Sequence, residues 1–155
     1  MTGRTGRLRA GNSRLAVRGL GLAAVVLGTY GCSGSPITPT RIEAALASTF
    51  ANLVRAQVSA LGLPPAAVAD LVVTARCRKP IGGTDTGSGE WTCAVMWKGG
   101  DRRALGDTYE LFVTTEGCYT ATVASENLGG PTVRAPDGRE VRNLLYAFEG
   151  CFDLL

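Results

Sequence analysis

The clearest pattern along the chain lies between residues 40 and 61, where apolar side chains return every three or four positions. This spacing predicts an amphipathic helix. Thr40 and Glu43 have the spacing of a capping box, and Gly62 followed by two prolines ends the pattern. Gln57 is a polar exception, and we expect the apolar stripe to pack against a sheet rather than a membrane. The stripe contains Ile42, Leu46, Phe50, Leu53, Val54, Val58 and Leu61.

From residue 70 onward the apolar period shortens to two, which predicts β-strands. Consecutive strands joined by short turns form an antiparallel meander. One N-terminal helix and four or five antiparallel strands predict an α+β domain in a cystatin-like arrangement, with the helix across one sheet face. The strands are expected at residues 71–77, 90–98, 107–115, 118–125, 132–134 and 140–141, and in a last segment over 144–152, for which a short helix is the alternative.

Alternation along residues 90–98 places Trp91 and Trp97 on one face of their strand. Together with Tyr109 they would either fill the core or form an aromatic platform for a sugar or a peptide. We favour the core, because cores use aromatic side chains heavily. The pattern does not decide which face the helix covers, because Met96 and Phe112 make the opposite face apolar too. If the helix covered that face, the tryptophans would be the best binding-site candidates.

The N-terminal region has the pattern of a targeting segment. Residues 19–31 form an uncharged, mostly apolar run, and no acidic residue precedes Cys32. A run of about a dozen residues is too short to cross a membrane as a helix, which takes roughly 20. A basic region followed by a short apolar one is typical of an export signal. The basic residues are Arg4, Arg7, Arg9, Arg14 and Arg18.

The apolar run ends on Gly28-Thr29-Tyr30-Gly31-Cys32, which resembles the lipobox of bacterial lipoproteins. The resemblance implies that the Cys32 thiol is diacylated, with palmitate-like chains, and that residues 1–31 are removed as a signal peptide. Two acyl chains hold a protein stably on a membrane. Residues 32–39 would then be a lipidated tether, of which 33–39 span at most about 23 Å, and residues 40–155 a single domain. A plain signal peptide or a structural cysteine is the alternative.

Four further cysteines, Cys77, Cys93, Cys118 and Cys151, form an even set in a chain expected to be exported, which predicts two disulfides. Of the three connectivities we favour Cys77 with Cys93 and Cys118 with Cys151, because each pair would join neighbouring strands. Each bridge would contribute about 3 to 4 kcal/mol in the chain-entropy model. A four-cysteine metal site is disfavoured, because the chain contains no Cys-x-x-Cys pair.

The composition excludes several kinds of chemistry. The chain contains no histidine, which rules out histidine-dependent triads, Cys-His dyads and histidine-ligated zinc or haem. Five of the sixteen basic residues lie before Cys32, so the rest of the chain has eleven basic and thirteen acidic residues. This balance does not favour binding to nucleic acid.

The remaining polar candidates are weak. Glu90, Glu110 and Glu116 suggest a paired-carboxylate hydrolase, but such sites normally lie in the deep cleft of a larger scaffold. Asp101, Arg102 and Arg103 form a charged turn that could touch lipid phosphates or acidic wall polymer, although charged turns are usually only solvated. We therefore expect no enzyme activity, no cofactor and no metal.

Several short motifs along the domain resemble those of small lipoproteins of actinobacterial cell envelopes, a group with no activity to transfer. The motifs are Cys77-Arg78-Lys79-Pro80 with the Gly-rich loop after it, Trp91-Thr92-Cys93-Ala94-Val95, Thr108-Tyr109-Glu110-Leu111 and the ending from Asn143 to Gly150.

We expect a non-catalytic binding or structural module at the outer face of the cytoplasmic membrane. The alternative is a ligand carrier or transporter accessory with a pocket between helix and sheet. The expected partners are the membrane, through the lipid anchor, and an envelope protein or wall component. We expect no nucleic acid, and a monomer.

Overall fold

The computed structural model describes residues 36–80, 84–100 and 103–152. It confirms the predicted α+β fold, in which one N-terminal helix packs on a five-stranded antiparallel sheet. The elements follow in the order α1 (Pro39–Ala60), the short 3-10 helix η1 (Pro65–Val68), β1 (Val72–Arg78), β2 (Gly89–Lys98), β3 (Ala104–Val113), β4 (Cys118–Val123), β5 (Thr132–Arg134), β6 (Glu140–Arg142) and β7 (Ala147–Cys151).

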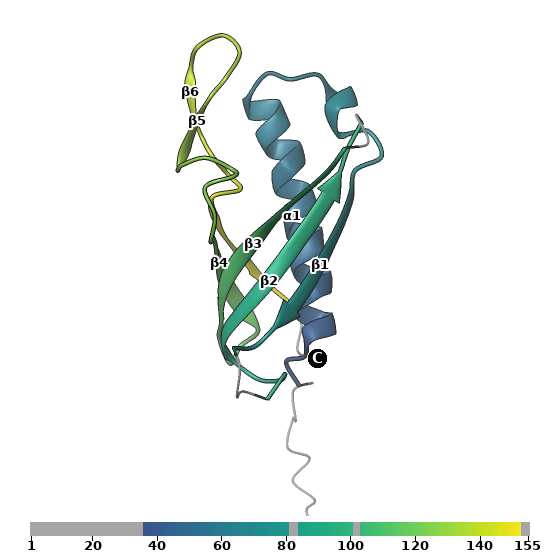
Figure 1. Ribbon diagram of the computed structural model, residues 1–155, viewed down its shortest axis with the longest axis vertical. Coiled ribbons are helices and arrows are strands. Elements are labelled where there is room, and N and C mark those ends of the chain that lie inside the picture. The colour runs from purple at the N-terminus through teal and green to yellow at the C-terminus, as the bar shows by residue number, and fades with distance from the viewer. Residues whose placement is uncertain (1–35, 81–83, 101–102, 153–155) are drawn as a thin grey trace, which may run out of the picture. The chain divides into compact units, whose positions relative to one another are not determined.

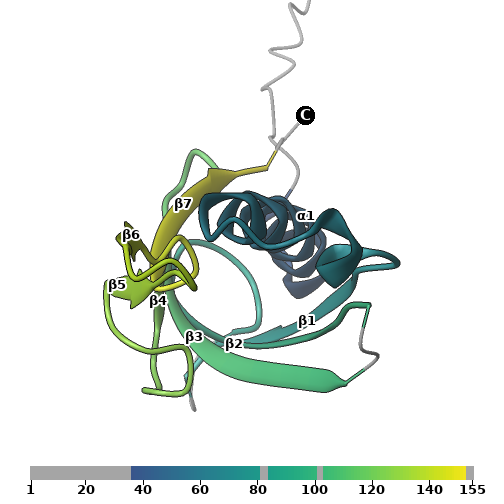
Figure 2. The same ribbon diagram turned by 90° about the horizontal axis from the view of Figure 1, so that it is seen from above.

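The sheet has the strand order β1-β2-β3-β4-β7, and every neighbouring pair is antiparallel. Strands β5 and β6 form a separate hairpin between β4 and β7 in the chain. The large sheet bends around α1, which lies on its concave side (Figures 1 and 2). Among the residues that the structure describes, no helix lies on the opposite, convex face of the sheet (Figure 2).

Helix α1 covers the face that carries the tryptophans. Trp91, Trp97 and Tyr109 are 1%, 9% and 0% exposed, so all three belong to the core. The Phe50 ring centre lies 4.9 Å from that of Trp97 and 5.7 Å from that of Tyr109. The aromatic rings therefore hold the helix to the sheet, as the favoured alternative predicted.

The polar exception on the helix, Gln57, is buried and has a partner far away in the chain. Its side-chain oxygen accepts a hydrogen bond of 2.6 Å from the backbone N–H of Leu144. The contact joins the last turns of α1 to the segment that leads into β7. The predicted last strand is shorter than expected, because residues 144–146 form a turn before β7 begins at Ala147.

The predicted capping box is wrong. Thr38, with an extended backbone, precedes the first helical residue Pro39, and no side chain caps the helix. Proline is well suited to this position, because the first turn of a helix has no acceptor for its N–H groups. Ile37 is buried, so the packed part of the chain extends ahead of the predicted boundary at residue 40.

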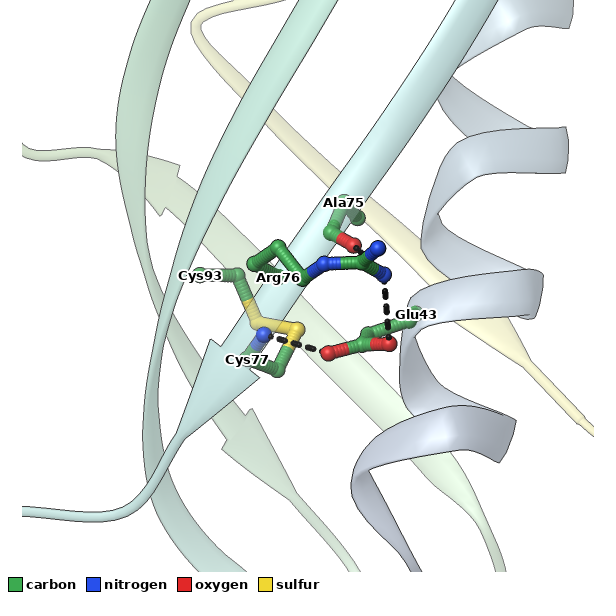
Figure 3. Close-up of polar contacts among 5 residues, drawn as sticks. All are labelled: Glu43, Ala75, Arg76, Cys77 and Cys93. Atoms are coloured by element: carbon green, nitrogen blue, oxygen red, sulfur yellow. Dashed lines mark hydrogen bonds and ion pairs between the residues drawn. A yellow bond between two sulfur atoms is a disulfide. The ribbon is translucent and has the colours of Figure 1, made fainter.

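Glu43 bonds to strand β1 instead of the helix start (Figure 3). Its Oε1 accepts a 2.9 Å hydrogen bond from the backbone N–H of Cys77, and its Oε2 lies 3.3 Å from Arg76 Nη1. Arg76 Nη1 also lies 3.4 Å from the carbonyl oxygen of Ala75, to which it donates. Because β1 is an outermost strand of the sheet, these contacts occupy backbone groups that would otherwise be free to pair with another strand.

Both predicted disulfides are present. Cys77 and Cys93 face each other across β1 and β2, with Cα atoms 4.1 Å apart. Cys118 and Cys151 face each other across β4 and β7, with Cα atoms 3.9 Å apart. Each bridge thus ties one outermost strand to its neighbour. Because structural disulfides persist in oxidising compartments, the domain belongs outside the cytoplasm.

Gly150 allows a close approach between β7 and β4. It lies opposite Tyr119, and a Cβ built at Gly150 would be 2.9 Å from Cε1 of the Tyr119 ring. Tyr119 is buried, so its ring has little room to move away.

Gly150→Ala is expected to lower the free energy of unfolding by about 1 to 3 kcal/mol, because the added methyl group overpacks the Tyr119 ring. Gly130→Ala is the matched control, since a Cβ there meets nothing within 4 Å. We expect the control to change the stability by less than about 0.5 kcal/mol. Urea unfolding of both variants measures the difference, and equal costs would contradict this account of Gly150.

Glu43→Ala is expected to lower the free energy of unfolding by about 1 to 3 kcal/mol, because it leaves the part-buried Cys77 N–H without its acceptor. Glu43→Gln keeps an acceptor oxygen and loses only the ion pair to the exposed Arg76, which contributes at most about 1 kcal/mol. Chemical denaturation should therefore show that the stability of Glu43→Gln lies between those of the wild type and Glu43→Ala. A glutamine variant as unstable as the alanine variant would show that charge, and not the hydrogen bond, is what matters.

Candidate functional site

The convex face of the sheet is formed by the even-numbered residues of β1, β2 and β3, whose side chains point away from α1, except that of Arg76, which reaches Glu43 on the helix. Most of these residues are polar, but Phe112 and Met96 are 56% and 49% exposed. Threonines occupy the neighbouring outward positions on β4, Thr120 and Thr122. An exposed aromatic ring thus lies among hydroxyl groups on a face that no other element of the described chain covers.

A depression of about 420 Å³ lies around Phe112, and we call it the Phe112 hollow. Two rows of residues that face one another across neighbouring strands, here called rungs, form this hollow. In one rung Glu90 faces Phe112, which faces Thr120, and in the next Thr92 faces Glu110, which faces Thr122. The tight turn at Gly117, whose φ is +80°, brings β4 back beside β3. It thereby fixes which residue of β4 faces each residue of β3 in the two rungs. The lining residues are Pro80, Glu90, Trp91, Thr92, Glu110, Leu111, Phe112, Thr120 and Thr122.

The Phe112 hollow is acidic. Glu90 and Glu110 are diagonal neighbours on β2 and β3, so their Cα atoms are expected about 7 to 8 Å apart. Both side chains are exposed, and within the described residues neither makes an ion pair or a side-chain hydrogen bond. Glu149 on β7 extends the first rung beyond Thr120. Arg78 on β1 faces Thr92 and is a diagonal neighbour of Glu90, but within the described residues it makes no ion pair with that carboxylate. Another basic residue of this face, Lys98, lies at the far end of β2.

This arrangement suits the binding of a cation better than catalysis. A carboxylic acid that serves as a proton donor in catalysis usually lies in an apolar pocket, whereas both of these carboxylates are exposed to water. Exposed carboxylates attract cations, and an aromatic face attracts an ammonium or guanidinium group by about 0.5 to 1 kcal/mol at an exposed site. The hollow offers both kinds of group.

The other carboxylate and turn residues considered from the sequence lie elsewhere. Glu116 is in the turn between β3 and β4, where its carboxylate accepts a 2.6 Å hydrogen bond from the Thr115 hydroxyl. That bond lowers the pKa of Glu116. Arg103 is exposed just before β3. Three predicted residues lie outside the described part of the chain, namely Cys32, Asp101 and Arg102.

The core contains a buried carboxylate, that of Asp107, which the sequence pattern does not reveal. Tyr109 donates a 2.7 Å hydrogen bond to the carbonyl oxygen of Leu145, and burial, with a further contribution from Asp107, raises the pKa of its hydroxyl. Asp107 is itself buried, and its Oδ1 accepts hydrogen bonds from the Ser125 hydroxyl and the Thr108 N–H at 2.6 and 2.7 Å. The only signal in the sequence was an acidic residue at an inward-facing strand position.

Asn143 is a second buried polar residue that the sequence analysis missed. Its side-chain amide donates to the carbonyl oxygens of Leu128 and Gly130 at 2.8 and 2.9 Å, and its oxygen accepts from the Leu145 N–H at 3.1 Å. These bonds attach the loop before β5 to the turn before β7. Both polar groups serve the fold and lie outside the Phe112 hollow.

Comparisons with protein-family models, with curated proteins and with solved structures found no match for this chain. Within the described residues, no helix is long and apolar enough to cross a membrane. The same part of the chain contains no group of three or more acidic or cysteine side chains placed to hold a metal ion.

Phe112→Thr is expected to change the free energy of unfolding by less than about 1 kcal/mol, because the ring is exposed and threonine is also a good strand former. Phe148→Ala is the comparison, and it should cost about 3 to 5 kcal/mol, since Phe148 packs against Phe50 and Tyr109 in the core. Urea unfolding measures both. If Phe112→Thr costs as much as Phe148→Ala, then Phe112 serves the fold and is not free for binding.

Proposed function

We propose that this chain is the precursor of a membrane-anchored extracytoplasmic lipoprotein, whose domain acts as a non-catalytic binding module. The basic leader with its short apolar run and the lipobox-like ending at Cys32 support the anchor. The two disulfides support the compartment, because the domain needs an oxidising environment to form them.

The start of the described chain fits a short tether. The carbonyl oxygen of Ile37 accepts a 2.9 Å hydrogen bond from the N–H of Gly87, so the chain is already attached to the domain five residues after Cys32. Five residues span at most about 17 Å. A lipid on Cys32 would therefore hold the domain close to the headgroups.

The tether would also orient the domain. The connection between β1 and β2, to which Ile37 is bonded, lies at the same end of the sheet as the turn between β3 and β4 (Figure 1). The hairpin of β5 and β6 lies toward the opposite end. Because Glu90 is the second residue of β2 and Phe112 the second-last residue of β3, the Phe112 hollow lies near the tethered end.

The observation that carries the binding role is the uncovered convex face with its exposed Phe112. A concave site with an apolar side chain and a few converging polar groups is the usual form of a binding site, and the Phe112 hollow has these features. The carrier alternative has less support, because Phe50, Trp97 and Phe148 fill the space between helix and sheet.

Cys32→Ser tests the anchor. In a bacterial host given a radiolabelled or clickable fatty acid, the wild-type chain should take up the label and remain with the membranes after a high-salt wash. Cys32→Ser should take up none, because serine has no thiol to acylate, and Ser33→Ala is the control that should behave as wild type. An unlabelled wild-type chain, or equal labelling of Cys32→Ser, would overturn the proposed lipoprotein.

A further inference from the structure

The described residues that line the Phe112 hollow include two carboxylates and no basic side chain. Glu90 and Glu110 flank the Phe112 ring, and neither is paired within the described residues. We propose that this hollow binds a basic segment of a partner polypeptide, with one lysine or arginine head group between the two carboxylates and its aliphatic stem on Phe112. The inference rests on the proposed function of a binding module and adds the chemical class of its partner.

Charge and apolar surface together favour this occupant. A long basic side chain combines an apolar stem with a charged end, which matches an exposed ring between two carboxylates. A neutral sugar would stack on Phe112 but would gain little from two unpaired negative charges. A metal ion needs several ligands fixed around one point, and the described residues offer no such group.

The neighbouring strands limit the direction of the segment. Arg78 on β1, which faces Thr92, would repel a second basic residue, whereas Glu149 on β7 would attract one. The rung that contains Glu90 continues through Phe112 and Thr120 to Glu149. A basic segment is therefore expected to lie across β2, β3, β4 and β7.

The strand spacing then predicts the spacing of the basic residues. From β2 to β7 the rung crosses three strand-to-strand steps, or about 14 Å at roughly 4.8 Å each. An extended peptide covers that distance in about four residues at roughly 3.4 Å per residue. Two basic residues four positions apart could thus reach Glu90 and Glu149 together, and the threonine hydroxyls between them could bond to the peptide backbone.

The test uses the protein as the bacterial host produces it, purified in neutral detergent from whichever fraction contains it, and the fluorescent peptide Lys-Ser-Thr-Ser-Lys. Fluorescence polarisation should show saturable binding at low salt that weakens at least about fivefold when the salt is raised, because exposed charges are screened. The peptide with glutamate in place of both lysines should not bind. Equal binding of the two peptides, or no saturable binding of the lysine peptide up to millimolar concentration, would overturn the proposal.

Variants locate the binding site. Glu110→Gln and Phe112→Thr should each weaken binding of the lysine peptide at least about fivefold. Glu126→Gln is the matched control, because it removes one exposed carboxylate between β4 and β5, away from the hollow, and it should stay within about twofold of wild type. Equal weakening by Glu110→Gln and Glu126→Gln would show that only net charge matters, and would overturn the site.

Two further outcomes separate this inference from the proposed function. If a neutral oligosaccharide binds and is lost in Phe112→Thr while the lysine peptide fails, the basic partner is wrong and the binding module stands. If the peptide binds as expected but the wild-type chain takes up no fatty acid, the membrane anchor fails and the site stands.

Discussion

The contact between α1 and the tryptophan face of the sheet determines the rest of the domain. Phe50 lies against Trp97 and Tyr109, and Ile42 and Leu46 are also fully buried. Burying aromatic and aliphatic side chains contributes about 1.5 to 3 kcal/mol each, so this face outweighs its more polar opposite. Once the helix is there, Phe112 and the outward carboxylates are left on the free side. The candidate site therefore follows from the choice of the core.

The same architecture limits how a partner can bind. The outermost strand β1 has backbone groups occupied by Glu43 and Arg76, and disulfides join β1 and β7 to their neighbours. Partners that add a strand to a sheet need a free edge, and this stretch of β1 is not free. On the convex face, by contrast, a partner would meet side chains and not free backbone groups.

The sequence predicted what depends on local pattern and missed what depends on distant contacts. Period-two alternation and even cysteine number were sufficient for the strands and the disulfides. The capping box failed because Glu43 bonds to Cys77, 34 residues away, and Gln57 had no visible role because its partner Leu144 is 87 residues away. Alternation could not choose the buried face, since Phe112 and Met96 are as apolar as a core requires.

The hollow itself is a product of strand register, which explains why the sequence did not reveal it. Glu90 and Glu110 are twenty residues apart and meet only because β2 pairs with β3 at one alignment. A slip of one residue would turn Glu90 inward and Trp91 outward, at a large cost in buried aromatic surface. The bridge between Cys77 and Cys93 likewise fixes the alignment of β2 with β1. The interactions that keep the tryptophans in the core thus also keep the two carboxylates beside Phe112.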